Sequence, residues 1–153
     1  MKRKIASNYK MKYIYFLLLL SGLVTAQTNT ANWKPIYDAG GQSLYIDVED
    51  LSRFTGDDVY VWARQKFSIP IVIETISEKI HYALTYYLIN KKLQRYSMLE
   101  VIYYDEDFNV LKSFSYNRKS TNEGYQYNYP ILKGSDVEMI LNKCMEYIPN
   151  EKK

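Results

Sequence analysis

The sequence contains few of the residues that carry most enzymatic and metal chemistry. Its 153 residues include one cysteine, Cys144, and one histidine, His81. One cysteine excludes a disulfide within the chain, and one histidine is not enough for a metal site. No phosphate-binding loop, serine-triad motif or catalytic pair of carboxylates is recognisable. We therefore expect a protein that is not an enzyme and uses no cofactor or metal, with His81 as a surface residue.

Glycine and glutamate are missing from the one segment that has the spacing of a calcium-binding loop. Asp105, Asp107 and Asn109 alternate as calcium ligands do. Such a loop also needs glycine at its sixth position and glutamate at its twelfth, where this chain has Val110 and Tyr116. We interpret the segment as a turn between strands, with its carboxylates in water.

Acidic residues are absent from the first 26 positions. Five basic residues precede the apolar run "YIYFLLLLSGLV", and Val24-Thr25-Ala26 has the small residues of a signal-peptidase site. We expect residues 1–26 to be a signal peptide cleaved after Ala26, and the segment from Met11 is already complete as one. The alternative is an uncleaved membrane anchor, but the apolar run is shorter than the roughly 20 residues that a spanning helix needs. Gln27 follows the cut, so a lipid-anchoring cysteine is missing there.

Removal of the signal peptide leaves no excess of positive charge. The full chain has 20 basic and 17 acidic residues, and five basic residues lie in the first 26, so the mature part has 15 against 17. A domain with this balance lacks the field that attracts a phosphate backbone, so we expect no nucleic-acid partner. The remaining residues are enough for one domain with a sizeable core and no disulfide.

The mature chain begins with a polar leader and continues as one domain. We expect a flexible leader at 27–32, a single globular domain at 33–149 and a tail at 150–153. Residues 43–48 and 58–67 have the pattern of strands, and Val59, Val61 and Ala63 alternate with larger side chains in the second. Residues 68–79 are ambiguous because Pro70 argues against a central strand.

The clearest strand signals lie in the middle of the chain. Residues 80–89 place Ile80, Tyr82, Leu84, Tyr86 and Leu88 on one face, and residues 95–104 place Tyr96, Met98, Ile102 and Tyr104 on one face. A third strand follows at 109–116. The connections are too short for parallel crossovers, so these strands form an antiparallel meander in a sheet of about five strands.

One helix is predicted near the C-terminus. Ser135 as N-cap and Glu138 three residues later form a capping box. A single apolar stripe follows at helical spacing, made of Val137, Ile140, Leu141, Cys144 and Ile148. The fold class is therefore α+β, with the helix at 135–148 packed on one face of the sheet. Cys144 lies on the apolar stripe, which predicts a buried structural thiol. An intermolecular disulfide and a catalytic nucleophile are the alternatives.

The order of these segments resembles the surface-adhesin E family of small exported bacterial domains. The segments that carry the resemblance are Trp33, "YID" at 45–47, "VYVW" at 59–62, "LINKKLQRYSMLEVIYYD" at 88–105 and "YPILKGSDVEMILNKC" at 129–144. The resemblance covers essentially the whole mature chain. It implies an antiparallel sheet with a C-terminal helix, and host extracellular proteins as partners. It also implies a second cysteine at the end of the first hairpin strand, where this chain has Lys91.

Tyrosine is the abundant residue that could form a binding surface. The chain has 17 tyrosines, and Tyr125, Tyr127 and Tyr129 alternate in a polar loop. Aromatic clusters of this kind build contact surfaces, so these three are the predicted binding residues. We expect a non-catalytic, exported binding module at the bacterial envelope or surface, with a protein partner or a second copy. The alternative is a periplasmic accessory domain that binds a small ligand in an aromatic pocket between sheet and helix.

Overall fold

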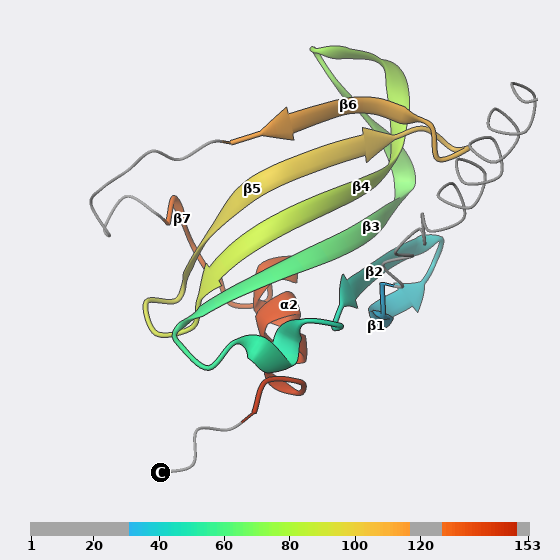
Figure 1. Cartoon of the computed structure of the whole chain (residues 1–153). Helices are drawn as coiled ribbons and strands as arrows, with labels where there is room; N and C mark the ends of the chain where they lie inside the picture. Colours follow the sequence, from blue (N-terminus) through green and yellow to red (C-terminus); the bar gives the residue numbers. More distant parts are fainter. Residues whose placement is uncertain (1–30, 117–126, 150–153) are drawn as a thin grey trace, which may run out of the picture. The chain divides into compact units, whose positions relative to one another are not determined.

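A computed structural model of the chain describes residues 31–116 and 127–149 (Figure 1). The expected α+β class is confirmed, and these residues form seven strands, instead of the expected five or so, and one C-terminal α-helix. The elements are β1 (Trp33–Ala39), β2 (Gln42–Asp47), η2 (Leu51–Arg53), β3 (Asp58–Ile73), β4 (Ile76–Asn90), β5 (Arg95–Tyr104), β6 (Val110–Ser115), β7 (Tyr129–Pro130) and α2 (Asp136–Met145). The predicted signal peptide, leader and tail lie outside the described residues, apart from Ala31 and Asn32.

The sheet is an antiparallel meander in which the order of strands follows the chain. Strands β1 to β6 lie side by side in sequence order, and β7 pairs with β5. The turn between β1 and β2 consists of Gly40 and Gly41, whose φ angles of 63° and 79° suit a tight hairpin. Short connections enforce this topology, since a hairpin leaves no room for a crossover.

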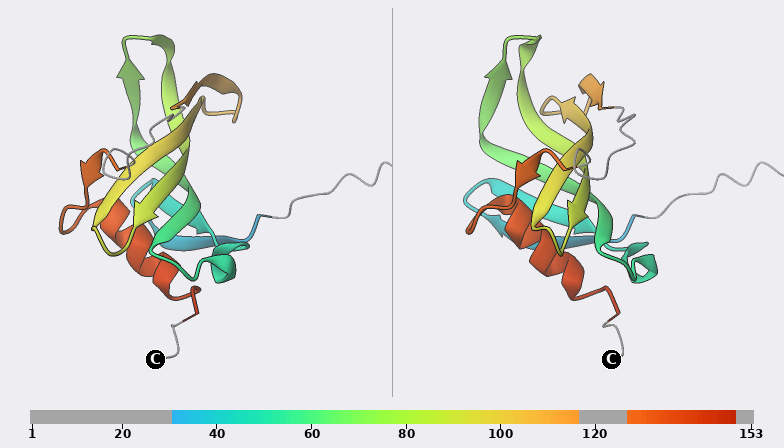
Figure 2. Two further views of the ribbon diagram at one scale, coloured as in Figure 1. Left: turned by 60° about the vertical axis from the view of Figure 1, so that its left-hand side comes forward. Right: turned by 90° about the vertical axis from the view of Figure 1, so that its left-hand side faces the viewer.

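Strands β3 and β4 run on through the segment that the sequence left ambiguous. Beyond Lys66 and Tyr82 the two strands pair only at Ile71↔Ile80 and Ile73↔Ile76. Pro70 lies in the irregular stretch between these pairs, where a missing N–H does not break the ladder. Residues 67–80 therefore form a hairpin arm that extends beyond the neighbouring strands (Figures 1 and 2).

The helix α2 begins at the predicted cap. The hydroxyl of Ser135 accepts a hydrogen bond from the Glu138 N–H (3.3 Å), and the Glu138 carboxylate accepts one from the N–H of Gly134 (2.6 Å). The capping box is thus confirmed, with its return bond shifted by one residue. The helix lies against one side of the sheet (Figure 2), and its apolar stripe is part of the core there. Among the described residues, no helix has the length and apolarity needed to cross a membrane.

The core lies between α2 and strands β2, β3 and β4. Val59, Val61 and Ala63 are buried there as the alternation predicts. The apolar stripe of the helix packs on the same cluster, which also includes Leu44, Ile46, Val48, Leu51, Ile89, Val137, Ile140, Leu141, Cys144 and Ile148. Burial of this apolar surface, at about 25 cal/mol per Å², is what holds the helix to the sheet.

A β-bulge in β5 divides the residues that the sequence predicts on one face of this strand between its two faces. The register shifts between Tyr86 and Tyr87, so that Met98 pairs with Tyr87 while Glu100 pairs with Tyr86. The extra residue, Leu99, reverses the alternation. Tyr96 and Met98 therefore face α2, whereas Ile102 and Tyr104 face the opposite side. The single face that the sequence predicts for these four residues is wrong for this reason.

Candidate binding surface

Cys144 is packed inside the core. Its side chain is 0 % exposed, and burial raises the pKa of its thiol to about 12. Almost none of it is thiolate at neutral pH, and no reagent or partner chain reaches it in the folded protein. The geometry supports the structural thiol and neither of the alternatives. Lys91, where the resemblance implies a second cysteine, directly follows β4, and its N–H donates to the carbonyl of Asp57 (2.8 Å).

The predicted loop tyrosines do not form one surface. Tyr125 lies outside the described residues. Tyr127 is buried, at 6 % exposure, and its hydroxyl donates to the Asp58 carboxylate (2.5 Å) and accepts from the side-chain amide of Asn90 (3.2 Å). The structure therefore does not place Tyr127 on the predicted contact surface, because its hydrogen bond to the Asp58 carboxylate holds the side chain inside the protein. Tyr129 is 44 % exposed, with its ring centroid 5.5 Å from that of Tyr96.

The acidic turn between β5 and β6 binds its own backbone. The carboxylate of Asp105 accepts hydrogen bonds from the N–H groups of Asp107 (2.9 Å) and Asn109 (2.8 Å) and from the side-chain amide of Asn109 (2.9 Å). The bonds from Asn109 hold the pKa of Asp105 below its usual value. Residues 31–116 and 127–149 contain no cluster of three or more histidine, cysteine or carboxylate side chains that could hold a metal.

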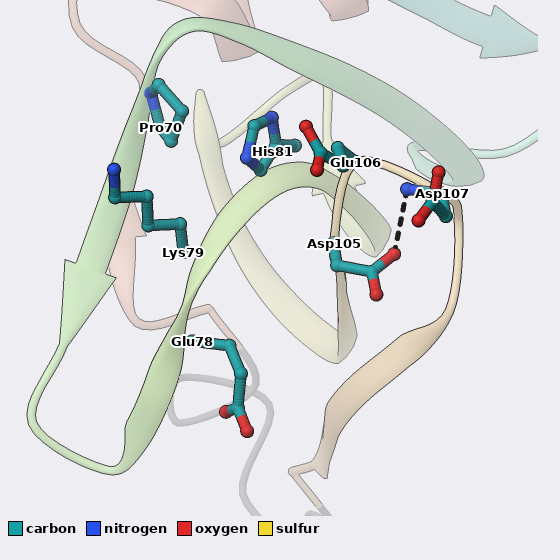
Figure 3. Close-up of a pocket in the computed structure, with 7 residues that line it drawn as sticks. All are labelled: Pro70, Glu78, Lys79, His81, Asp105, Glu106 and Asp107. Atoms are coloured by element: carbon teal, nitrogen blue, oxygen red, sulfur yellow. Dashed lines mark hydrogen bonds between the residues drawn. The ribbon is translucent and has the colours of Figure 1, made fainter.

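A pocket of about 420 Å³ lies between this turn and the hairpin arm (Figure 3). Its lining consists of Pro70, Glu78, Lys79, His81, Asp105, Glu106 and Asp107. His81 lies in it, half-buried and between the arm and the turn, whereas the sequence predicts a surface position. The lining is polar and of mixed charge.

The side of the sheet opposite α2 carries a different chemistry, and we call it the outer face. Along β3 it presents Tyr60, Trp62, Arg64 and Lys66, since the alternate residues Val59, Val61 and Ala63 face the helix. The four residues form a row of two aromatic and two cationic side chains about 20 Å long. The apolar face predicted for residues 80–89 is part of this outer face, because those residues pair with the row across β3 and β4.

The aromatic half of the row belongs to a continuous cluster of rings. Trp62 and Tyr86 stack with centroids 4.7 Å apart at 21°, and Tyr60 lies 6.1 Å from Tyr86 and 5.8 Å from Phe54. Desolvation in this stack raises the pKa of Tyr86. All four rings are half-buried. Since Trp62 and Tyr86 stack, each covers one face of the other, and the edges of both rings stay available for contacts.

The cationic half of the row is held in place by aromatic rings. The guanidinium of Arg64 lies 4.9 Å from the ring centroid of Trp33 and 5.2 Å from that of Tyr45. The ammonium of Lys66 lies 5.8 Å from the ring of Tyr82. Cation–π contacts of this kind orient the side chains without neutralising them.

Comparison with known proteins does not identify the chain, since no family model, no curated protein and no solved structure matches it. The function therefore has to be argued from the surface itself. The sequence contains the signal for the row, an alternation of Tyr60, Trp62, Arg64 and Lys66 against small apolar residues. The rings that orient the two cations come from other strands and leave no such signal.

Proposed function

We propose that the protein is a non-catalytic, exported binding module whose outer face contacts a protein partner at the bacterial envelope or surface. The observation that carries this proposal is the aromatic and cationic row on β3. Interfaces are enriched in tyrosine, tryptophan and arginine because these side chains bury large areas at a low entropic cost. Rings that are already stacked are pre-organised, so binding loses little further freedom.

Two further features support the proposal that the protein is exported and that it is not an enzyme. The first 26 residues have the charge, apolar run and cleavage site of a signal peptide. The only thiol of the chain is buried with its pKa raised to about 12, which suits packing and not nucleophilic attack. The adhesin-like order of segments makes host extracellular proteins the partners that we propose for the cell surface.

The alternative, a small ligand between sheet and helix, has less support. Ile46, Val59, Ile140 and Cys144 meet there and are each 0 % exposed. A ligand would have to displace close-packed apolar side chains, whereas on the outer face Lys66 is exposed and Tyr60, Trp62 and Arg64 are partly exposed.

Site-specific cross-linking tests the proposed surface. A photoreactive phenylalanine analogue replaces Tyr60 on the outer face in cells that export the protein, and the matched control carries it at Asn142, which is exposed on α2. We expect a defined cross-linked protein with the first probe and none with the control. Loss of the product in Trp62→Ala would assign it to the aromatic stack. Equal products from both probes, or none, would contradict the proposal.

Protease treatment of intact cells separates the two locations. A protein at the cell surface is cleaved in intact cells, whereas a periplasmic one is cleaved only after rupture of the outer membrane. Cleavage only after rupture would exclude host proteins as partners and favour a periplasmic accessory role.

A further inference from the structure

The two cations on the outer face lack acidic counterparts. Among the described residues, ion pairs join Arg53 to Asp50 and Lys143 to Glu146, and neither Arg64 nor Lys66 forms one. Each cation lies instead against aromatic rings, 4.9 to 5.8 Å from the ring centroids. Two positive charges of fixed position are thus available on a face that α2 does not cover.

The carboxylates on the same face accept hydrogen bonds from groups other than the two cations. The register places Asp38, Asp47, Asp58 and Glu100 on it. Asp38 accepts a hydrogen bond from the hydroxyl of Tyr45 (2.5 Å), and Asp47 accepts bonds from the backbone N–H groups of Asn32 (2.9 Å) and Glu49 (3.1 Å). Asp58 accepts bonds from Tyr127 and Asn90, and Glu100 accepts one from the hydroxyl of Ser113 (3.4 Å).

Asp38 is the carboxylate aligned with Lys66 across the sheet, and β2 lies between them. The two form no ion pair, and the Asp38 carboxylate is bonded to the Tyr45 hydroxyl instead. The local field at Arg64 and Lys66 is therefore not cancelled by contact.

We infer that this part of the outer face binds an acidic, extended segment of a protein partner, with Arg64 and Lys66 receiving its carboxylates. The inference rests on the proposed function and specifies the chemistry of the partner. Alternate residues of a β-strand are about 6.6 Å apart, and the two cations are such alternate residues. A bound strand with acidic side chains at every second position has the same spacing, so both charges are matched at once.

The neighbouring rings favour a peptide over a sulfated sugar. Sugar rings bind to open aromatic faces, but Tyr86 covers one face of Trp62, and the guanidinium of Arg64 covers one face of Trp33. Ring edges carry partial positive charge, which suits carboxylates and peptide carbonyls. The aromatic half of the row therefore extends the same preference for an acidic, extended chain.

Titration with model peptides tests the inference. The purified protein is titrated at low ionic strength with a capped (Ser-Glu)₄ peptide, its (Ser-Gln)₄ analogue and a block Glu₄-Ser₄ peptide. Binding is followed by calorimetry and by tryptophan fluorescence, to which Trp33 and Trp62, the two tryptophans of the chain, contribute. We expect the alternating acidic peptide to bind most tightly and its affinity to fall with added salt.

The variants assign the binding to the two cations. We expect Arg64→Gln and Lys66→Gln each to weaken binding of (Ser-Glu)₄ about threefold, and the double variant about tenfold. Lys112→Gln is the matched control, since Lys112 also lies near a ring, that of Phe114 at 6.0 Å, but on the helix side of the sheet. It should bind as the unchanged protein does.

Several outcomes would overturn the inference. Binding that is equal for the alternating and block peptides would refute the matched spacing, and equal affinity in the double variant would refute the two cations. Binding of a heparin fragment without binding of the peptide would assign the site to a sulfated glycan instead. A cross-link at Tyr60 that persists in the double variant would leave the proposed function intact while this inference fails.

Discussion

Removal of the Tyr127 hydroxyl is the perturbation whose effect on stability follows most directly from the structure. The hydroxyl donates a hydrogen bond to the carboxylate of Asp58 (2.5 Å). The side-chain amide of Asn90 donates to the same carboxylate (2.6 Å) and to the Tyr127 hydroxyl (3.2 Å). These contacts join the segment before β7 to the start of β3 and the end of β4. Tyr127→Phe keeps the ring and deletes the hydrogen bond to the charged acceptor Asp58 and the longer bond from Asn90. Loss of the bond to the charged group alone costs about 1.5 to 3 kcal/mol.

The assay is equilibrium unfolding in urea, followed by far-UV circular dichroism. For a domain of this size the same loss lowers Tm by about 5 to 15 °C. The matched control is Tyr129→Phe, two residues further on, because Tyr129 is 44 % exposed and should change stability by less than about 0.5 kcal/mol. A double-mutant cycle with Asp58→Asn isolates the coupling between the two groups. Equal stability of Tyr127→Phe and the unchanged protein would refute the argument.

The same tyrosine predicts a loss of stability in alkali. Burial and the Asp58 carboxylate raise the pKa of Tyr127 from 10.0 to about 12, and burial raises that of Tyr87 to about 12. A group with a higher pKa in the folded chain stabilises the fold fully below pH 10, and this contribution disappears as the pH rises from 10 to 12. Unfolding free energies measured across this range should therefore fall, and less steeply in Tyr127→Phe.

Two further predictions concern α2. Cys144, at 0 % exposure, should react with a thiol reagent only at the rate of unfolding, so rapid labelling of the native protein would contradict its burial. Ser135→Ala removes the side-chain acceptor of the Glu138 N–H and should lower the free energy of unfolding in urea by about 1 kcal/mol. Ser135→Asp supplies another acceptor and should keep the stability of the unchanged protein. Equal losses in both variants would show that the cap does not act through this bond.

Features that depend on neighbours in the chain were accessible from the sequence. The capping box of Ser135 and Glu138 and the apolar stripe of α2 are local patterns, so they predict both the helix and the burial of Cys144. The hairpin connections are short, and this alone makes the sheet an antiparallel meander. The alternation around Val59 and Val61 gives the correct buried face of β3.

Features that depend on pairing between distant segments came only from the tertiary structure. The bulge at Leu99 reverses the faces of β5, and no local pattern encodes a register shift. Tyr127 is buried because Asp58, 69 residues away, holds its hydroxyl. Trp33 and Tyr45 reach Arg64 from two other strands. Local periodicity therefore determined the elements of this protein, whereas strand pairing across the sheet determined which side chains meet on its candidate binding surface.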